Sequence, residues 1–501
     1  MSSKITQVFR KNIFPSHFVN RQVRCLQSPS FMLRNSRSDL FHSSFSRNFS
    51  NVKDAESGHK VEAVIQDASK VPEEKLVTSL RELAQRKLFD ILKKLKKDPG
   101  TPQSATSWKD LWIVIRDNWK QVLGIGILTD ILLAFAVIKF SEYRVNLALE
   151  TGTRPNPKVL EDELIPRPQI SETLKKVFQP DERHSYYHVI CGEHGTGKTT
   201  LTRMEARNVG KGVIYVDIPS DFDNLGEAFG KAINLSFFED VSITTLLLRK
   251  FFSVIGSSSE SAISLYKWRR VMKIFRHASE VYTKNKNKPP VIIYDNISRI
   301  VNENPKILDI LQDDAKDNAD QRTYIAVFVS SEGSVPRRME SRSAWSRAKK
   351  PVMEIGDLNK EESMEYLIKK RNIKEVDAKK IYDLVGGRIV DLKTVVDDFL
   401  AGQSFEVIKQ QVLTEVEKKF QSAQLLPNDS HYNVGKSIIS NLLKSKELTF
   451  LEFKKYFNKA YELNEVLGSN VFAYHPGKNT VTFQSQSIEY YIREYSDMFT
   501  K

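Results

Sequence analysis

One loop pattern constrains the fold of this chain more than any other feature. The pattern is Gly192-x-x-x-x-Gly197-Lys198-Thr199, with a short apolar run, 187–191, before it and a helix-favouring run, 201–206, after it. This spacing is typical of a phosphate-binding loop between a strand and a helix. Glycines permit a positive φ, so successive backbone N–H groups can converge on an anion at the electropositive helix start. The pattern therefore predicts a phosphate site at the carboxyl end of a buried strand.

The chemistry of the loop assigns roles to its polar residues. We expect Lys198 to reach the β- and γ-phosphate oxygens and the Thr199 hydroxyl to ligate Mg²⁺. The predicted cofactors are thus ATP and Mg²⁺. The predicted nucleotide contacts, several of them through the backbone alone, are Gly192, Glu193, His194, Gly195, Thr196, Gly197, Lys198, Thr199 and Thr200. The alternative is an ordinary glycine-rich turn before a helix.

Further apolar runs follow the loop, separated by helical patterns. They lie at 213–217, 291–295, 323–329 and 352–355, and a long, mostly helical stretch, 225–282, separates the first two. A continuous apolar run suits a strand that is buried on both faces of a parallel sheet. Strands that alternate with helices predict an α/β fold, a doubly wound parallel sheet of the P-loop NTPase class.

Two of these runs end in polar residues that suit a triphosphate site. Asp295 ends the run 291–295, where a Walker B aspartate would hold Mg²⁺. Ser330 follows the run 323–329, in a position to sense the γ-phosphate. Arg337 comes shortly afterwards, where it could serve as an arginine finger in the site of a neighbouring subunit. A solvated basic loop is the alternative for Arg337.

Three short elements around the loop carry a family resemblance. They are Ile165-Pro166-Arg167, Ile355-x-x-Leu358-x-x-Glu361-Glu362 and Leu384-Val385-Gly386-Gly387-Arg388. Together with the loop, they resemble the AAA+-related ATPases, particularly the STAND and archaeal-type ATPase branch, over residues 163–396. The resemblance implies that Arg167 lies close to the nucleotide and that Arg388 is a sensor in a helical lid.

The chain departs from this family directly after the predicted magnesium aspartate. The family usually has an acid there to orient or deprotonate the attacking water, whereas this chain has Asn296. An amide can orient water but cannot accept its proton. We therefore expect nucleotide binding with slow hydrolysis, or a switch held by nucleotide.

The N-terminal residues have the composition of a targeting segment followed by a membrane anchor. Residues 1–50 carry eight Lys/Arg and one acid, are rich in serine and lack a continuous apolar run, which is typical of a mitochondrial transit peptide. A disordered basic tail is the alternative. Residues 51–105 read as a helical stalk. Residues 106–145 read as an interfacial helix plus a single membrane span, 122–138, whose only charge is Asp130; a buried core helix is the alternative.

Composition excludes some classes of protein. The chain has 501 residues and only two cysteines, which rules out a disulfide framework or a cysteine-rich zinc site. The net charge of +14 suggests a nucleic-acid partner, but residues 1–50 account for +7 of it, because eight cations and one acid lie there.

We expect three further domains after the anchor: an ATPase core at 158–358, a helical lid at 359–425 and a winged-helix-like domain at 426–501 with a hairpin around Pro476-Gly477-Lys478-Asn479. No basic stripe emerges in the last domain, which favours protein contact, self-assembly or autoinhibitory packing over nucleic acid. The leading hypothesis is a membrane-anchored mitochondrial ATPase that switches a partner or an assembly. The layout is similar to that of the mitochondrial escape protein family of the inner membrane. The alternatives are a nucleic-acid-handling ATPase of mitochondrial genome maintenance and a pseudo-ATPase scaffold.

Overall fold

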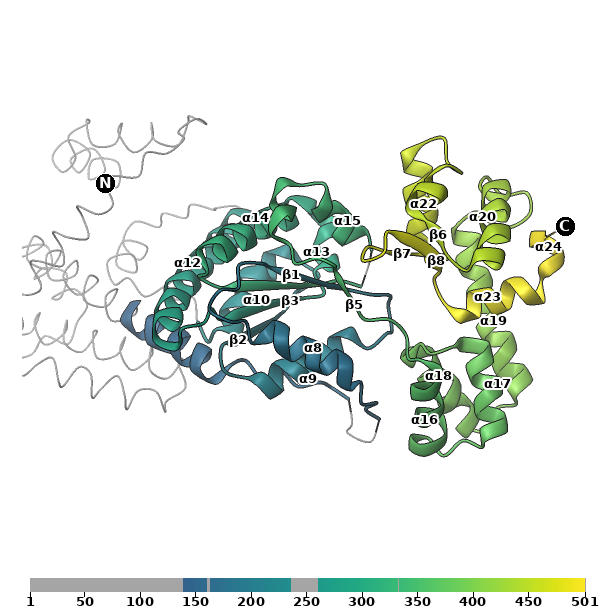
Figure 1. Cartoon of the computed structure of the whole chain (residues 1–501), viewed down its shortest axis with the longest axis horizontal. Helices are drawn as coiled ribbons and strands as arrows, with labels where there is room; N and C mark the ends of the chain where they lie inside the picture. Colours follow the sequence, from purple (N-terminus) through teal and green to yellow (C-terminus); the bar gives the residue numbers. More distant parts are fainter. Residues whose placement is uncertain (1–137, 160–162, 236–259, 332, 501) are drawn as a thin grey trace, which may run out of the picture. The chain divides into compact units, whose positions relative to one another are not determined.

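A computed structural model describes residues 138–159, 163–235, 260–331 and 333–500 (Figure 1). The described residues form a parallel sheet covered by helices, a group of lid helices and a C-terminal domain with a small antiparallel sheet. The predicted transit peptide, stalk and membrane span lie outside the described residues, apart from the last residues of the predicted anchor. Among the residues that the structure does describe, no helix has the length and apolar character that crossing a membrane requires.

The parallel sheet confirms the predicted α/β fold. Its strands lie in the order β2-β3-β4-β1-β5, and every neighbouring pair is parallel. The strands are β1 (His188–Cys191), β2 (Val213–Asp217), β3 (Val291–Asp295), β4 (Ile325–Val329) and β5 (Met353–Glu354). β4 inserts between β1 and β3, so the carboxyl ends of β1, β4 and β3 meet at one edge of the sheet.

Helices cover both faces of this sheet, which explains why its strands are apolar on both sides. Alternate residues separate the two layers: Ile190 faces one apolar cluster, whereas Val189 faces the other. One layer contains α8 (Pro168–Phe178) and α9 (Lys198–Val209). The other layer contains α10 (Leu225–Ala232), α12 (Glu260–Lys286), α13 (Ser298–Glu303), α14 (Pro305–Gln321) and α15 (Ser334–Glu340), with the short turns η3 (Phe222–Asn224) and η4 (Ser343–Arg347) (Figure 1).

The core begins earlier in the chain than the predicted boundary at residue 158. Residues 138–151 form a helix whose Val145, Ala148 and Leu149 are buried in the cluster that lies against one face of the sheet. The backbone N–H of Thr153 then donates to the carbonyl of Val213 at 3.0 Å. Residues 138–145, assigned to the anchor from sequence, are therefore part of the domain that contains the parallel sheet, because the apolar side of their helix packs against that sheet.

The lid forms its own apolar cluster after β5. It contains α16 (Lys360–Glu365), η5 (Tyr366–Lys370), α17 (Glu375–Val385), α18 (Ile389–Leu400) and α19 (Phe405–Ser422). α16 begins at Asn359, whose side chain accepts from the Glu362 N–H while the Glu362 carboxylate accepts from the Asn359 N–H, a capping box. Gly387 sits where no side chain fits, because a Cβ there would lie 1.8 Å from the carbonyl oxygen of Leu358. This close approach joins the lid to the segment that leaves β5.

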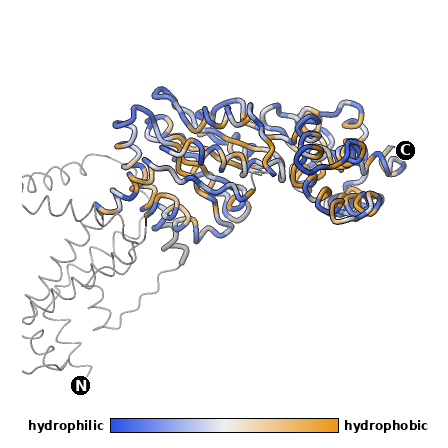
Figure 2. Tube along the Cα trace, turned by 90° about the horizontal axis from the view of Figure 1, so that it is seen from below, coloured by the Kyte–Doolittle hydropathy of each residue, from blue (hydrophilic) through white to orange (hydrophobic). Residues whose placement is uncertain are grey.

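The C-terminal domain has a separate core and contains the predicted hairpin. Strands β7 (Phe472–His475) and β8 (Thr480–Phe483) pair antiparallel, and a short strand that the sequence did not reveal, β6 (Leu448–Thr449), pairs with β8. The helices are α20 (Tyr432–Ser445), α21 (Phe450–Lys454), α22 (Ala460–Gly468), α23 (Gln486–Glu494) and α24 (Ser496–Thr500). Figure 2 shows apolar stretches within both the sheet region and this domain, as expected for two separate cores.

Candidate functional site

The loop between β1 and α9 has the backbone that its glycines predict. Gly192, Gly195 and Gly197 have φ of 149°, 83° and 86°, a region that residues with a side chain rarely adopt. α9 begins directly afterwards, at Lys198, so its N-terminal N–H groups open onto the loop. This arrangement places convergent donors and the positive end of a helix at one point, which is the geometry of an anion site.

Lys198 lies inside this loop. Its side chain is buried, and Nζ donates to the carbonyl oxygen of Glu193 at 2.5 Å and to Thr196 Oγ1 at 3.4 Å. Burial lowers the pKa of Lys198 to about 8, although the nearby charge of Glu193 opposes this shift. The ammonium is therefore positioned for phosphate oxygens and is easier to deprotonate than an exposed lysine.

The two predicted magnesium ligands come together. Thr199 Oγ1 donates to Asp295 Oδ1 at 3.4 Å, although the residues are far apart in sequence. Asp295 is buried, and this burial raises the pKa of its carboxyl group. A hydroxyl, a carboxylate and phosphate oxygens form a donor set that suits Mg²⁺. The described residues contain no group of three or more His, Cys, Asp or Glu that could hold a metal by themselves.

A charged network that sequence reasoning missed supports Asp295. The Tyr215 hydroxyl donates to Asp295, and Arg203 Nε donates to the same hydroxyl at 2.8 Å. Arg203 Nη2 also binds Asp217 Oδ2 at 2.6 Å, and Arg299 Nη1 lies 3.3 Å from Asp217 Oδ1. One signal was available: β2 and β3 both end in aspartate, and Asp217 pairs in register with Asp295.

Asn296 adopts an unusual backbone conformation beside this network. Its φ is 65°, which asparagine tolerates better than most residues. Its side-chain amide donates to Asp217 Oδ1 at 3.1 Å, toward β2 and away from β4. In this arrangement the amide is engaged by the neighbouring aspartate, and the expected slow hydrolysis stays a prediction.

Ser330 lies where the γ-phosphate sensor was predicted. It is buried directly after β4, and its N–H donates to the carbonyl of Ile190 at 2.9 Å. This contact places Ser330 beside the strand that leads into the phosphate loop. Its sensing role stays a prediction.

Arg388 reaches the loop from the lid. It is buried at the start of α18, pairs with Asp357 at 3.0 Å and donates through Nη2 to the carbonyl of Gln484 at 2.6 Å. A Cβ on Gly195 would lie 3.4 Å from Arg388 Cδ, and the Val390 N–H donates to the carbonyl of Gly195 at 3.3 Å. The structure thus brings the predicted lid residue against the phosphate loop.

The other two predicted arginines make contacts that the sequence did not indicate. Arg167 donates to the carbonyls of Gly356 and Asp357, at 2.8 and 3.2 Å, so it joins the start of α8 to the segment after β5. Arg337 donates to Asn464 of α22 and lies over the Phe450 ring, 5.3 Å from its centre. In this chain Arg337 therefore contacts the C-terminal domain, and its role in a neighbouring subunit stays a prediction.

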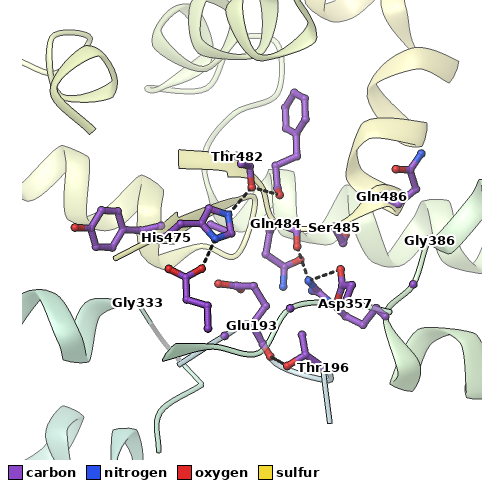
Figure 3. A pocket seen from close by; sticks show the side chains of 18 of the residues that line it. Glu193, Thr196, Gly333, Asp357, Gly386, His475, Thr482, Gln484, Ser485 and Gln486 are labelled. Atoms are coloured by element: carbon purple, nitrogen blue, oxygen red, sulfur yellow. Dashed lines mark hydrogen bonds and ion pairs between the residues drawn. The ribbon is translucent and has the colours of Figure 1, made fainter. Parts of the chain in front are cut away.

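The C-terminal hairpin lies beside the phosphate loop (Figure 3). Glu354, at the end of β5, binds His475 Nδ1 at 3.0 Å and accepts from the Gly477 N–H at 2.7 Å. A cavity of about 320 Å³ is lined by loop residues, including Glu193, by lid residues and by the end of β8, including Gln484. Predicted nucleotide contacts, lid residues and the C-terminal hairpin thus meet at one point of the described structure.

Residues 172–395 match the family described as an ATPase domain predominantly from Archaea. No curated protein matches the chain. Among solved structures, a Walker-type ATPase of Pyrococcus abyssi is 14% identical with a TM-score of 0.42, covering 68% of this chain and 99% of that one. Cdc6p of Pyrobaculum aerophilum is 12% identical with a TM-score of 0.33, and the match covers 70% of this chain and 98% of that one. The ORC2 protein of Aeropyrum pernix is 11% identical with a TM-score of 0.34, and the match covers 69% of this chain and 98% of that one.

The match over residues 172–395 confirms the archaeal-type ATPase part of the predicted resemblance. The similarity in layout to mitochondrial escape proteins is not shown by any comparison. The predicted P-loop fold rests on the sheet order and on the loop geometry described above.

The lowered pKa of Lys198 predicts how ATP binding changes with pH. Below about pH 8 the ammonium is charged and the affinity for Mg²⁺–ATP should be constant; above it the free protein loses the charge that the phosphates need. At pH 9 about a tenth of such a group stays protonated, so affinity should fall about tenfold. Isothermal titration from pH 7.5 to 9.5 measures this, with thermal unfolding at each pH as the control for an intact fold. An affinity that is flat up to pH 9.5 would contradict the assignment.

Proposed function

We propose that this protein binds ATP with Mg²⁺ and acts as a slow nucleotide-dependent switch on a protein partner or on its own assembly. The observation that carries the proposal is the convergence of Lys198, Thr199 and Asp295 at the end of a parallel sheet. Lys198 would hold the terminal phosphates, and the other two would hold Mg²⁺, which screens the charge of the triphosphate. The family match over residues 172–395 supports the same cofactor.

Three contacts give a route from the nucleotide to the rest of the chain. The lid reaches the loop through Val390 and Arg388. The C-terminal domain reaches the end of β5, the strand that pairs with β1, through the Glu354–His475 pair. A triphosphate that attracts Arg388 away from Asp357 would change the balance of these contacts, because both are anions that compete for one guanidinium. Nucleotide state would then be read out as the position of the lid and the C-terminal domain.

The C-terminal domain supports protein contact better than DNA contact. Its element order, α20-β6-α21-α22-β7-β8, supports a winged-helix assignment, in which α22 would take the place of the recognition helix. α22 carries Glu462 and Glu465, which would repel phosphates, and its Asn464 accepts from Arg337 of the ATPase core. A nucleic-acid-handling ATPase is therefore the second candidate, favoured only by this element order.

We also propose that the protein is anchored in the mitochondrial inner membrane. The support is the basic, acid-poor composition of residues 1–50 and the apolar run 122–138, both outside the described residues. Carbonate extraction of isolated mitochondria should leave the protein in the membrane pellet, because a span of about 17 apolar residues resists extraction. Complete release into the soluble fraction would contradict the anchor.

The nucleotide proposal predicts a large effect of removing one ammonium. Full-length Lys198→Ala should bind Mg²⁺–ATP at least roughly tenfold more weakly than the wild type, because a charge-assisted contact to phosphate is lost. Lys211→Ala, which removes an exposed lysine just beyond α9, is the matched control and should bind as the wild type does. Equilibrium binding of a fluorescent ATP analogue measures both. A wild-type protein without affinity for ATP and Mg²⁺, or equal affinities in all three proteins, would contradict the proposal.

Asn296 predicts the rate of hydrolysis. Asn296→Glu should raise turnover by roughly tenfold or more, because a carboxylate can accept the proton of the attacking water. Asn296→Asp is the companion variant, because aspartate tolerates the positive φ at this position better than glutamate. Phosphate release under saturating ATP measures the rate, with Asp295→Asn as the inactive control. The assignment of slow hydrolysis to Asn296 would be refuted by a wild-type protein that already hydrolyses ATP briskly and is slowed by Asn296→Glu. Binding of ATP without turnover in the wild type would favour the scaffold alternative.

A further inference from the structure

The side chain of Glu193 points from the phosphate loop toward the C-terminal domain (Figure 3). Glu193 is the first residue after Gly192, in a loop that binds through its backbone, so its side chain is not needed for phosphate contact. The side-chain amide of Gln484, just beyond β8, lines the same cavity as Glu193 (Figure 3) and favours the charged form of its carboxyl group, which lowers the pKa of that group. Lys419 of α19 in turn donates to the amide oxygen of Gln484 at 3.5 Å. The loop carboxylate is therefore held by residues of the lid helices and of the C-terminal hairpin.

Four cationic or ionisable groups face this carboxylate, and each comes from a different element. Arg388 at the start of α18, His475 of β7 and Lys198 of the loop favour its charged form. The negative charge of Glu193 in turn favours the charged form of Lys419 of α19. Burial acts against them and raises the pKa of Glu193. Glu193 is thus a half-buried anion at the centre of a set of cations that a phosphate would also attract.

A carboxylate in this position works against nucleotide binding. The loop has to accept a triphosphate, and like charges in a partly desolvated site repel one another. A side chain without charge would bind ATP more tightly, so the carboxylate needs another explanation. The contacts supply one, because the carboxylate holds Gln484, while Arg388 binds the carbonyl oxygen of Gln484 at 2.6 Å.

We propose that Glu193 is an internal anion that holds the lid and the C-terminal hairpin against the phosphate loop, and that the terminal phosphate of ATP displaces it from its cations. The inference rests on the proposed function and adds its regulation. Without nucleotide, the Glu193 carboxylate attracts the surrounding cations and keeps the lid and hairpin docked on the loop. With ATP bound, the terminal phosphate attracts the same cations in its place. Loss of the Glu193–Gln484 contact then releases the end of β8, whereas Glu354 continues to bind His475 and Gly477.

The test uses the full-length protein and the variant Glu193→Gln, which keeps the shape of the side chain and removes its charge. Binding of Mg²⁺–ATP should become about tenfold tighter, the equivalent of about 1.4 kcal/mol, and binding of ADP should tighten by less. Hydrogen exchange of residues 472–484 without nucleotide should become faster than in the wild type and should approach that of the wild type with ATP. Glu193→Ala provides a second uncharged variant, and Glu182→Gln, an exposed acid before β1, is the matched control that should change nothing.

The outcomes separate this inference from the proposed function. If the wild type binds ATP but Glu193→Gln and Glu193→Ala bind it no more tightly, Glu193 is not a competing anion and the inference fails alone. The same holds if ATP leaves the exchange of residues 472–484 unchanged in the wild type. If neither the wild type nor the variants bind ATP, the proposed function fails and this inference fails with it.

Discussion

The contact between Thr199 and Asp295 is the one on which the site depends. It joins the start of α9 to the end of β3, and it exists only because β4 lies between β1 and β3 and brings three strand ends to one edge. Every other part of the site is placed relative to this edge. Ser330 directly follows β4, and the loop begins where β1 ends. A sheet with another strand order would separate the Thr199 hydroxyl from the Asp295 carboxylate and leave the proposed magnesium site incomplete.

The charges at this edge are costly to bury, and the structure shows how that cost is offset. Lys198, Asp295 and Arg388 are all at most 4% exposed. Each has a partner: a backbone carbonyl for Lys198, hydroxyl groups for Asp295 and the Asp357 carboxylate for Arg388. Buried charges with partners contribute little net stability, whereas removing one partner leaves the other charge uncompensated. The stability of the fold therefore does not account for these buried charges, whereas the proposed binding of a nucleotide does.

Local patterns in the sequence predicted most of the fold, but they did not predict the side-chain networks of the site. The five strands, the lid and the hairpin around Pro476 could be predicted because each has a periodic or turn signature of its own. The Arg203–Tyr215–Asp217 network has no such signature, because its members are brought together only by the pairing of β2 with β3 and by α9. Glu193 and Gln484 are even further apart in the sequence, and no local pattern around Glu193 predicts that they lie close together.

The contacts of Arg337 would link self-assembly to the state of the C-terminal domain if this arginine serves a neighbouring subunit. Its guanidinium is engaged by Asn464 and by the ring of Phe450, both in the C-terminal domain. An arginine that serves a neighbouring subunit has to be free to reach that subunit's phosphate. Both contacts cannot be made at once by one side chain. If Arg337 serves a neighbouring subunit as proposed, that role and its contacts with Asn464 and Phe450 are mutually exclusive, and release of the C-terminal domain would free Arg337 for it.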